Sequence, residues 1–287
     1  MKKLTFLSII CSVVFISGCL GALKATTEFG VPAIKVAEGA AKAARPISDS
    51  EEYYLGRSVA ANIMGLYKSY DDQNLLKYVN LVGKTAALNS KKPETFGGYH
   101  FAVLDSKEIN AMACPGGIIF VTKGLVDLMT SEDELAAVLA HEIGHIINKD
   151  GVNAVKSSRW TQALAVLGSA AVQQYGSEGF GQLVGLFEGS VEDVVKTLVV
   201  NGYGRTQELE ADKSATEILI ASGYDPGALS RVLDYYRQRE GSDNTGFFKT
   251  HPGSSERISN LEKNQARDIV LPNDARTLRF NRIILKH

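Results

Sequence analysis

Cysteine and net charge of either sign are both scarce in this sequence. Its 287 residues include only 3 cysteines, which excludes the dense disulfide framework of small secreted domains. The 31 basic and 32 acidic residues leave a net charge of −1, so nothing in the charge balance favours a nucleic-acid partner. With 45% hydrophobic residues and no evident internal repeat, the composition is that of a soluble globular enzyme.

The N-terminus carries a targeting signal. Two lysines after Met1 precede the apolar run Leu4 to Ile16, which is too short to cross a bilayer as an ordinary helix and is typical of a signal peptide. The run ends in Ile16-Ser17-Gly18-Cys19, which resembles the bacterial lipobox, where cleavage precedes an acylated cysteine. An ordinary signal peptide with an incidental cysteine is the alternative. We expect lipidation at Cys19 and a membrane attachment through this lipid anchor.

These signals divide the chain into three expected segments, which are a signal peptide (1–18), a lipidated tether (19–47) and a folded domain (48–287). Leu20 is not the aspartate associated with inner-membrane retention. The expected location is therefore the bacterial cell envelope, at the outer membrane facing the periplasm. Cys114 is left without an intramolecular partner, and we interpret it as a buried apolar filler.

Hydrophobic periodicity predicts a mainly helical α+β domain with a small β-sheet of about three strands. Short runs rich in Val, Ile and Phe indicate the strands, and a Pro-Gly-Gly sequence forces a turn between the last two. The expected strands are Tyr99–Leu104, Asn110–Cys114 and Gly117–Thr122, and the expected helices are Glu51–Tyr67, Asp72–Leu88, Gly124–Met129 and Ser131–Asn148.

The last of these helices contains the pattern H-E-x-x-H. Because residues four apart share one helix face, His141 and His145 point the same way and can bind one zinc ion. Glu142 lies on the adjacent flank, from which it can accept a proton from water at the metal. A capping-box pattern at Ser131 and Glu134 starts the helix, and its apolar stripe predicts burial. Because unpaired buried histidines are costly, a metal site is favoured over two chance surface histidines.

A catalytic zinc needs a third protein ligand. Positions 148 and 151 are asparagine and glycine, which excludes the metzincin continuation of the motif. Residues 151–177 contain no acidic side chain, so the ligand must come from further downstream. One acidic group there lies in an amphipathic segment and is typical of a solvated face; it consists of Glu188, Glu192 and Asp193.

The second acidic group is Glu208-Leu209-Glu210-Ala211-Asp212, which follows a Gly202-Tyr203-Gly204 break. It opens a new helix, with Thr206 expected near the N-cap. Glu208 and Asp212 share one face, so one carboxylate can bind the metal while the other accepts an N–H from a ligating histidine. The alternative is that acidic residues here only stabilise a helix N-terminus.

Four ordered motifs together carry a family resemblance. They are the H-E-x-x-H helix, the Glu208 to Asp212 group, Asn110-Ala111 ahead of Pro115-Gly116-Gly117, and Thr250-His251-Pro252 followed by Arg257. The chain resembles the HtpX-like, CAAX prenyl protease type family of zinc metallopeptidases, in particular its secreted bacterial lipoprotein and periplasmic members. The resemblance implies a zincin fold of the gluzincin class with one Zn²⁺ per chain, Glu208 as third ligand, and Asp212 orienting a ligating histidine.

The resemblance also implies roles for the other motifs. His251 and Arg257 are offered as donors to the carbonyl oxygen on which charge develops, although His251 can instead bind zinc in a resting enzyme. A segment of four residues resembles the edge strand along which such enzymes hold an extended substrate, with a plain core strand as the alternative. These residues are Asn110, Ala111, Met112 and Ala113.

Membrane-embedded members of that family have transmembrane helices where this chain has two apolar stretches, Trp160–Val172 and Leu183–Val200. The first is too short to cross a bilayer, and the second contains charged residues. We expect core helices or a helical lip over the cleft, with a shallow membrane contact as the alternative.

The expected function is zinc-dependent endopeptidase activity on unfolded or misassembled envelope proteins, with Glu142 as general base. Its partners would be extended polypeptides and outer-membrane assembly machinery. One alternative is an envelope chaperone or assembly factor with gated or minor proteolysis. Another is a structural lipoprotein with a vestigial site, against which the intact set of ligands and base argues.

Overall fold

The computed structural model describes residues 46–155, 187–240, 246–252, 254–264 and 274–284. The expected signal peptide, Cys19, most of the tether and the stretch Trp160–Val172 lie outside the described residues. Almost all described residues belong to one unit, formed by residues 47–156 and 188–287, which carries both the sheet and the candidate site.

Two helices precede the sheet, and each begins at a residue whose side chain caps it. α3 (Asp49–Leu66) follows Ser48, whose hydroxyl accepts from Glu51 N at 3.3 Å while Glu51 Oε2 accepts from Ser48 N at 2.8 Å. α4 (Gln73–Leu88) follows Asp72, whose carboxylate accepts from the backbone N–H groups of residues 74 and 75. These caps explain why both helices begin close to the predicted positions.

The sheet has three strands, as predicted: β1 (His100–Leu104), β2 (Ala111–Cys114) and β3 (Ile118–Thr122). Their order is β1-β3-β2, with β1 parallel and β2 antiparallel to β3. Gly116 and Gly117 have φ angles of 78° and 112°, which other residues rarely adopt, so the turn between β2 and β3 depends on glycine. The strand order places β2 at an edge of the sheet, against the central helix.

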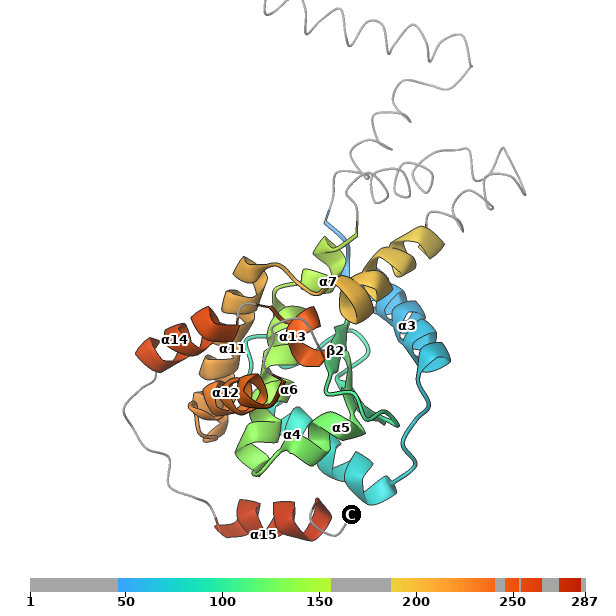
Figure 1. Ribbon diagram of the computed structural model, residues 1–287. Helices are drawn as coiled ribbons and strands as arrows, with labels where there is room; N and C mark the ends of the chain where they lie inside the picture. The colour runs from blue at the N-terminus through green and yellow to red at the C-terminus, as the bar shows by residue number, and fades with distance from the viewer. Residues whose placement is uncertain (1–45, 156–186, 241–245, 253, 265–273, 285–287) are drawn as a thin grey trace, which may run out of the picture. The chain divides into compact units, whose positions relative to one another are not determined.

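The central helix is α6 (Glu132–Ile147), around which the unit is packed (Figure 1). It contacts α4, α12 (Ala228–Glu240), β2 and α11 (Arg205–Ser222), and every residue from Leu135 to Ile146 is buried. α11 approaches very closely at Gly144, where a Cβ would lie 2.9 Å from the carbonyl oxygen of Ala211. The close approach brings the H-E-x-x-H face of α6 up to the acidic group of α11.

The start of α6 differs in one detail from the predicted capping box. Ser131 Oγ accepts from Glu134 N at 3.3 Å, as expected. The Glu134 carboxylate, however, accepts from Thr130 N at 2.7 Å, one residue further back than the box requires. The reciprocal bond is thus present but shifted, so the helix start is still capped from both sides.

α11 begins after the predicted break, but not at Thr206. Its N-cap is Gly204, so Thr206 lies inside the first turn. Glycine has no side chain to offer, and Gln207 completes the cap because its Oε1 accepts from Gly204 N at 3.0 Å. The prediction of Thr206 near the N-cap is therefore off by two positions.

The remaining elements surround this core. Residues 187–196 are helical, with Glu188 and Glu192 exposed as predicted for a solvated face, and they continue into the π-helical turn η1 (Thr197–Asn201). No helix in the described ranges is long and apolar enough to span a membrane. The other helices are α5 (Lys123–Leu128), α7 (Asp150–Asn153), α13 (Gly246–Thr250), α14 (Ser254–Asn264) and α15 (Asp274–Ile283). The whole confirms the predicted mainly helical α+β zincin architecture.

Candidate metal centre

α6 presents the two histidines of the motif together, as predicted. His141 and His145 are both buried, their ring centroids are 4.7 Å apart, and their Nε2 atoms are 3.1 Å apart. Glu142 is fully buried on the same turn, and neither of its carboxylate oxygens has a hydrogen-bond partner among the described residues. The i, i+4 spacing on a buried helix thus aims both imidazoles at one point, with the Glu142 carboxylate beside them.

Two further side chains converge on the same point. Glu208, from the first turn of α11, has its Oε2 3.4 Å from His141 Nε2 and its Oε1 3.6 Å from His145 Nε2. His251, directly after α13, has its Nδ1 3.1 Å from Glu208 Oε1 and 3.3 Å from His141 Nε2. One ligand atom from each of the four residues lies within 4.8 Å of the others.

The donor set fits a divalent metal ion. Three imidazole nitrogens and one carboxylate are the ligand types that transition metals take in proteins. All four side chains are buried. So many buried polar groups facing one point are costly unless they share a cation.

Asp212 and Arg257 contact two of these ligand-type side chains, His141 and Glu208. Asp212 Oδ1 is 2.9 Å from His141 Nδ1, so the Nε2 of that ring is left to face the cluster. Arg257, on α14, donates from Nε and Nη2 to the two Asp212 oxygens at 2.8 and 2.7 Å. Its Nη1 lies 2.7 Å from Glu208 Oε2 and donates to the His251 carbonyl at 3.2 Å. One buried guanidinium therefore supports both Glu208, the acidic member of the cluster, and the aspartate that contacts His141.

The electrostatics of the cluster favour ionised carboxylates. Burial acts to raise the pKa of Glu208, but its interactions with His251 and Arg257 outweigh burial and hold that pKa well below its usual range. At Asp212, burial likewise acts to raise the pKa, but the Arg257 guanidinium outweighs it and lowers the pKa of Asp212 to about 2. Both acids are thus in the state that a metal site requires.

The two histidines differ in protonation. Burial lowers the pKa of His145, which keeps this ring neutral at pH 7. Burial and Arg257 also act to lower the pKa of His141, but its hydrogen bonds to Asp212 and Glu208 outweigh them and raise it to about 9. A metal ion that binds at His141 Nε2 must therefore displace a proton.

Three residues around His145 were not found from the sequence. Asp150 Oδ2 lies 2.8 Å from His145 Nδ1, and Gln207 Nε2 donates to the other Asp150 oxygen at 3.1 Å. The Tyr203 ring stacks on His145 with centroids 4.3 Å apart and an interplanar angle of 27°. The one local signal for Asp150 is its position five residues after His145, just past the end of α6.

The predicted substrate strand lies beside the cluster. Ala111, Met112 and Ala113 are buried in the edge strand β2. Asn110 precedes them, and its Oδ1 accepts from Ala111 N at 2.9 Å and from Thr250 Oγ1 at 3.1 Å. The asparagine side chain thus ties the start of β2 to the residue before His251.

Two side chains complete the surroundings of the centre. Phe247, which the sequence did not single out, stacks on His251 with centroids 4.3 Å apart. Cys114 is free and buried, as predicted, and burial followed by the nearby Glu142 charge raises the pKa of its thiol. Glu210 is exposed and, as predicted, points away from the cluster.

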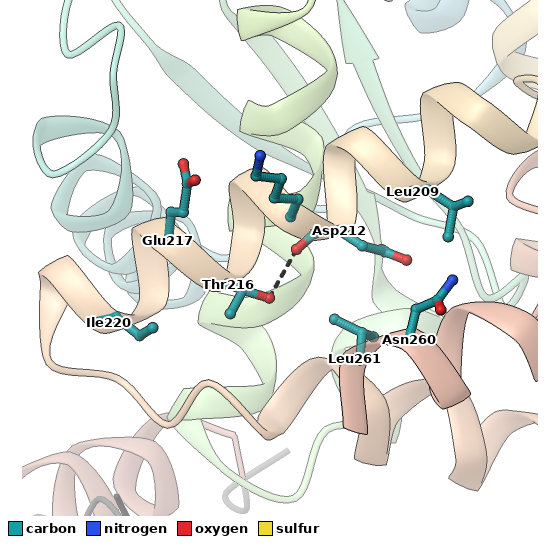
Figure 2. Close-up of a pocket in the computed structure, with 8 residues that line it drawn as sticks. Leu209, Asp212, Thr216, Glu217, Ile220, Asn260 and Leu261 are labelled. Atoms are coloured by element: carbon teal, nitrogen blue, oxygen red, sulfur yellow. Dashed lines mark hydrogen bonds between the residues drawn. The ribbon is translucent and has the colours of Figure 1, made fainter. Parts of the chain in front are cut away.

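A separate pocket of about 570 Å³ lies on the outer side of α11, against α14 (Figure 2). Asp212 is the one residue of the metal surroundings among those that line it, and its backbone carbonyl accepts from Thr216 Oγ1 at 2.9 Å. The pocket is therefore distinct from the metal-ligand cluster. Its other lining residues are Leu209, Lys213, Glu217, Ile220, Asn260 and Leu261.

Comparison with known proteins gives several distant relatives. The chain is 26% identical over 235 residues to the beta-barrel assembly-enhancing protease of Escherichia coli (strain K12), covering 78% of this chain and 46% of the relative. It is 29% identical over 169 residues to the metalloprotease LoiP of the same strain, covering 59% of this chain and 64% of the relative. It is 27% identical over 161 residues to the mitochondrial metalloendopeptidase OMA1 of Schizosaccharomyces pombe, covering 54% of this chain and 43% of the relative. The chain thus spans less than two thirds of the length of each of these relatives.

Residues 74–265, about two thirds of the chain, match the model of a protein family described as peptidase family M48. The matched range contains the H-E-x-x-H helix, the acidic group of α11, His251 and Arg257. It confirms the predicted resemblance, and the chain belongs to peptidase family M48.

Proposed function

We propose that this chain is a zinc metalloendopeptidase that hydrolyses peptide bonds of unfolded or misassembled envelope proteins. The observation that carries the proposal is the convergence of four buried ligand-type side chains beside Glu142, whose carboxylate accepts no hydrogen bond from the described residues. A buried carboxylate that accepts no hydrogen bond is costly, so its presence beside a metal cluster supports a catalytic role. Membership of a peptidase family agrees with it.

In this proposal His141, His145 and Glu208 hold the zinc. Two imidazoles and one carboxylate are a known ligand set of catalytic zinc and leave one coordination position open. Bound there, zinc supplies a Lewis acid that polarises the scissile carbonyl and makes water more acidic.

Glu142 is the proposed general base. It takes a proton from the attacking water as the water oxygen bonds to the carbonyl carbon, and it delivers that proton to the amine as the C–N bond breaks. Its place on the same turn as both histidines, fully buried, supports this role because water exclusion strengthens the electrostatic interactions of the site.

Arg257 is proposed to position other side chains of the site, and not to donate to the substrate carbonyl as the resemblance implied. A guanidinium has five N–H donors. Three of those in Arg257 donate to the two Asp212 oxygens and the His251 carbonyl, and Nη1 also pairs with Glu208. These contacts leave His251 as the candidate donor to the carbonyl oxygen.

His251 has two proposed roles, which predict opposite results. Its Nδ1 lies in the ligand cluster and its Nε2 is 3.5 Å from Glu142 Oε1. If His251 occupies the zinc in a resting enzyme, His251→Ala raises the initial rate of cleavage of an unfolded protein. If it donates to the carbonyl oxygen, the same substitution lowers that rate.

An extended substrate is proposed to lie along Asn110 to Ala113. The support is that β2 is an edge strand packed against the helix that carries Glu142. Edge strands bind extended peptides mainly through backbone groups, which gives broad sequence tolerance. Because the Asn110 side chain is already bonded to Thr250, its proposed part is to hold the strand in place.

The proposed location is the bacterial cell envelope, with the chain anchored by a lipid on Cys19 at the outer membrane facing the periplasm. Ile16-Ser17-Gly18-Cys19 supports it, and the name of one relative, a beta-barrel assembly-enhancing protease, suggests outer-membrane assembly machinery as a partner. Metabolic labelling with a fatty acid tests it: the label is expected on the chain and absent from Cys19→Ala, and label on both would refute it.

The test of the catalytic proposal is Glu142→Gln in the full chain with zinc. We expect zinc content to stay unchanged and cleavage of an unfolded protein to fall at least about 100-fold, because the amide cannot accept the proton. Glu210→Gln is the matched control, since it removes an exposed carboxylate from α11. Undiminished cleavage by Glu142→Gln would refute the assignment.

The alternative function is that of an envelope chaperone or assembly factor with gated or minor proteolysis. The placement of His251 in the ligand cluster favours it, because a filled cluster restrains the protease. Aggregation of an unfolded outer-membrane protein, measured by light scattering, distinguishes the two. Equal suppression by the natural chain and Glu142→Gln, without fragments, would favour the chaperone.

A further inference from the structure

We propose that Asp150 and Gln207 are positioning residues that set His145 for metal binding, and that Gln207 couples this histidine to the third ligand, Glu208. The inference rests on the proposed metal site at His145. It concerns a support at His145, separate from the contacts that Asp212 and Arg257 make with His141 and Glu208.

The first step concerns the tautomer of His145. Its Nδ1 lies 2.8 Å from Asp150 Oδ2, and both side chains are buried. A carboxylate accepts only, so the Nδ1 atom must carry the proton, and Nε2 is left with a free lone pair. That Nε2 is the atom that faces His141 and Glu208.

The second step concerns how Asp150 reaches a residue five positions earlier in the chain. α6 ends at Ile147, and Lys149 adopts the left-handed conformation with φ 58° and ψ 32°, the one positive φ of a non-glycine residue in the described ranges. The helix is interrupted there, and α7 starts at Asp150. Such strain is costly and persists where the surroundings enforce it; here it delivers the carboxylate to His145.

The third step concerns the other oxygen of Asp150. Gln207 Nε2 donates to Asp150 Oδ1 at 3.1 Å, while Gln207 Oε1 accepts from Gly204 N at 3.0 Å. Both ends of the amide are used, so it bridges α7 to the first turn of α11. The next residue on α11 is Glu208. The turn that presents the third ligand is therefore tied to the aspartate that orients the second.

The fourth step is the contrast with His141. Asp212 shares its charge with a bidentate guanidinium, whereas Asp150 is bonded to a neutral amide. In both cases the aspartate fixes the tautomer and the orientation of the histidine that it contacts, but the group that holds the aspartate is charged at His141 and neutral at His145. The stacked Tyr203 ring covers one face of His145, so ring rotation is blocked as well.

The test measures zinc release, not activity. Each full-length variant is loaded with zinc and mixed with a coloured chelator, and the release rate and metal-free unfolding midpoint are recorded. We expect Asp150→Asn to weaken zinc retention by about 10–100-fold, as does the positive control Asp212→Asn, because the amide keeps the shape but loses the charge. Gln207→Ala is expected to give a smaller loss. Thr206→Ala, at an exposed neighbour of Gln207, is expected to change nothing.

The outcomes separate this inference from the proposed function. If His145→Ala releases zinc but Asp150→Asn and Gln207→Ala retain it as the natural chain does, the inference is overturned and the metal site stands. If the natural chain binds no zinc, or His145→Ala retains it unchanged, the metal site itself is refuted. A metal-free midpoint that stays constant in Asp150→Asn shows that a loss of retention is not general unfolding.

Discussion

Two arginines contact carboxylates between α11 and α14, and only one of these arginines is buried. Arg257 is 1% exposed and contacts Glu208 and Asp212. Arg205 pairs with Glu256 at the surface, where its side chain is 69% exposed. The same chemistry between the same helices therefore occurs in two dielectric environments, which allows the role of burial to be measured.

Replacing Arg257 by alanine is expected to destabilise the metal-free protein by about 3–5 kcal/mol, because two buried carboxylates lose their counter-charge. Urea unfolding monitored by circular dichroism measures the change. Arg205→Ala is the control, and its unfolding midpoint should match that of the natural chain because water screens the exposed pair. Equal midpoints for both variants would contradict the assignment of Arg257 as the main support of the cluster.

Between elements, the most extensive contact is that of α6 with α11. Gly144 has no room for a Cβ, which would lie 2.9 Å from Ala211 O and 3.0 Å from Ala211 Cα. The two helices carry the three proposed zinc ligands, so a spacing change there separates His141 and His145 from Glu208. Gly65 on α3 has nothing within 4 Å of the same position and offers the matched comparison.

Gly144→Ala is expected to cost about 1–3 kcal/mol through overpacking and to accelerate zinc release, as the ligand helices move apart. Gly65→Ala is expected to be neutral or to stabilise by up to about 1 kcal/mol, since alanine is the better helix former. Unfolding midpoints and chelator-driven zinc release provide both readouts. A Gly144→Ala protein with unchanged zinc release would show that the helix spacing does not control the site.

Much of the element order was predictable because its causes are local. The Pro-Gly-Gly turn, the cap at Asp72 and the apolar stripe of α6 each act within a few residues, and the three strands appear where they were expected. The pairing order β1-β3-β2 depends on contacts between distant segments. Nothing in the local pattern of each strand specifies that order.

The residues of the site likewise divide into those that a local pattern predicts and those that depend on contacts between distant segments. His141, Glu142 and His145 follow from a four-residue spacing, and Glu208 was reached only with the aid of the family resemblance. Asp150 was missed because an aspartate at a helix start has a sufficient local explanation. Its contact with His145 depends on the left-handed Lys149, a conformation that a lysine does not signal.

At the scale of the whole molecule, the packed unit is larger than the matched family range. The match covers residues 74–265, yet α3 and α15 lie outside it and bury side chains. α15 packs on α4 and α6. Arg279 Nε donates at 2.8 Å to Glu132, the first residue of α6, which also accepts from the Tyr78 and Tyr224 hydroxyls at 3.1 Å each. The C-terminal helix therefore secures the N-terminal end of the helix that carries the metal motif.

If α15 is a constitutive part of the fold, its buried aromatic residue must matter to global stability. Phe280 is 2% exposed and belongs to the main hydrophobic core, whereas Leu278 on the same helix is 70% exposed. Phe280→Ala is expected to cost about 3–5 kcal/mol in urea unfolding through lost burial and a cavity. Leu278→Ala should stay within about 0.5 kcal/mol of the natural chain. Because α15 contacts α6 at Glu132, the first residue of that helix, zinc stoichiometry in the folded state should remain unchanged in both variants. Equal stability of the two variants would mean that α15 is only an appendage, and that the catalytic helix is held without it.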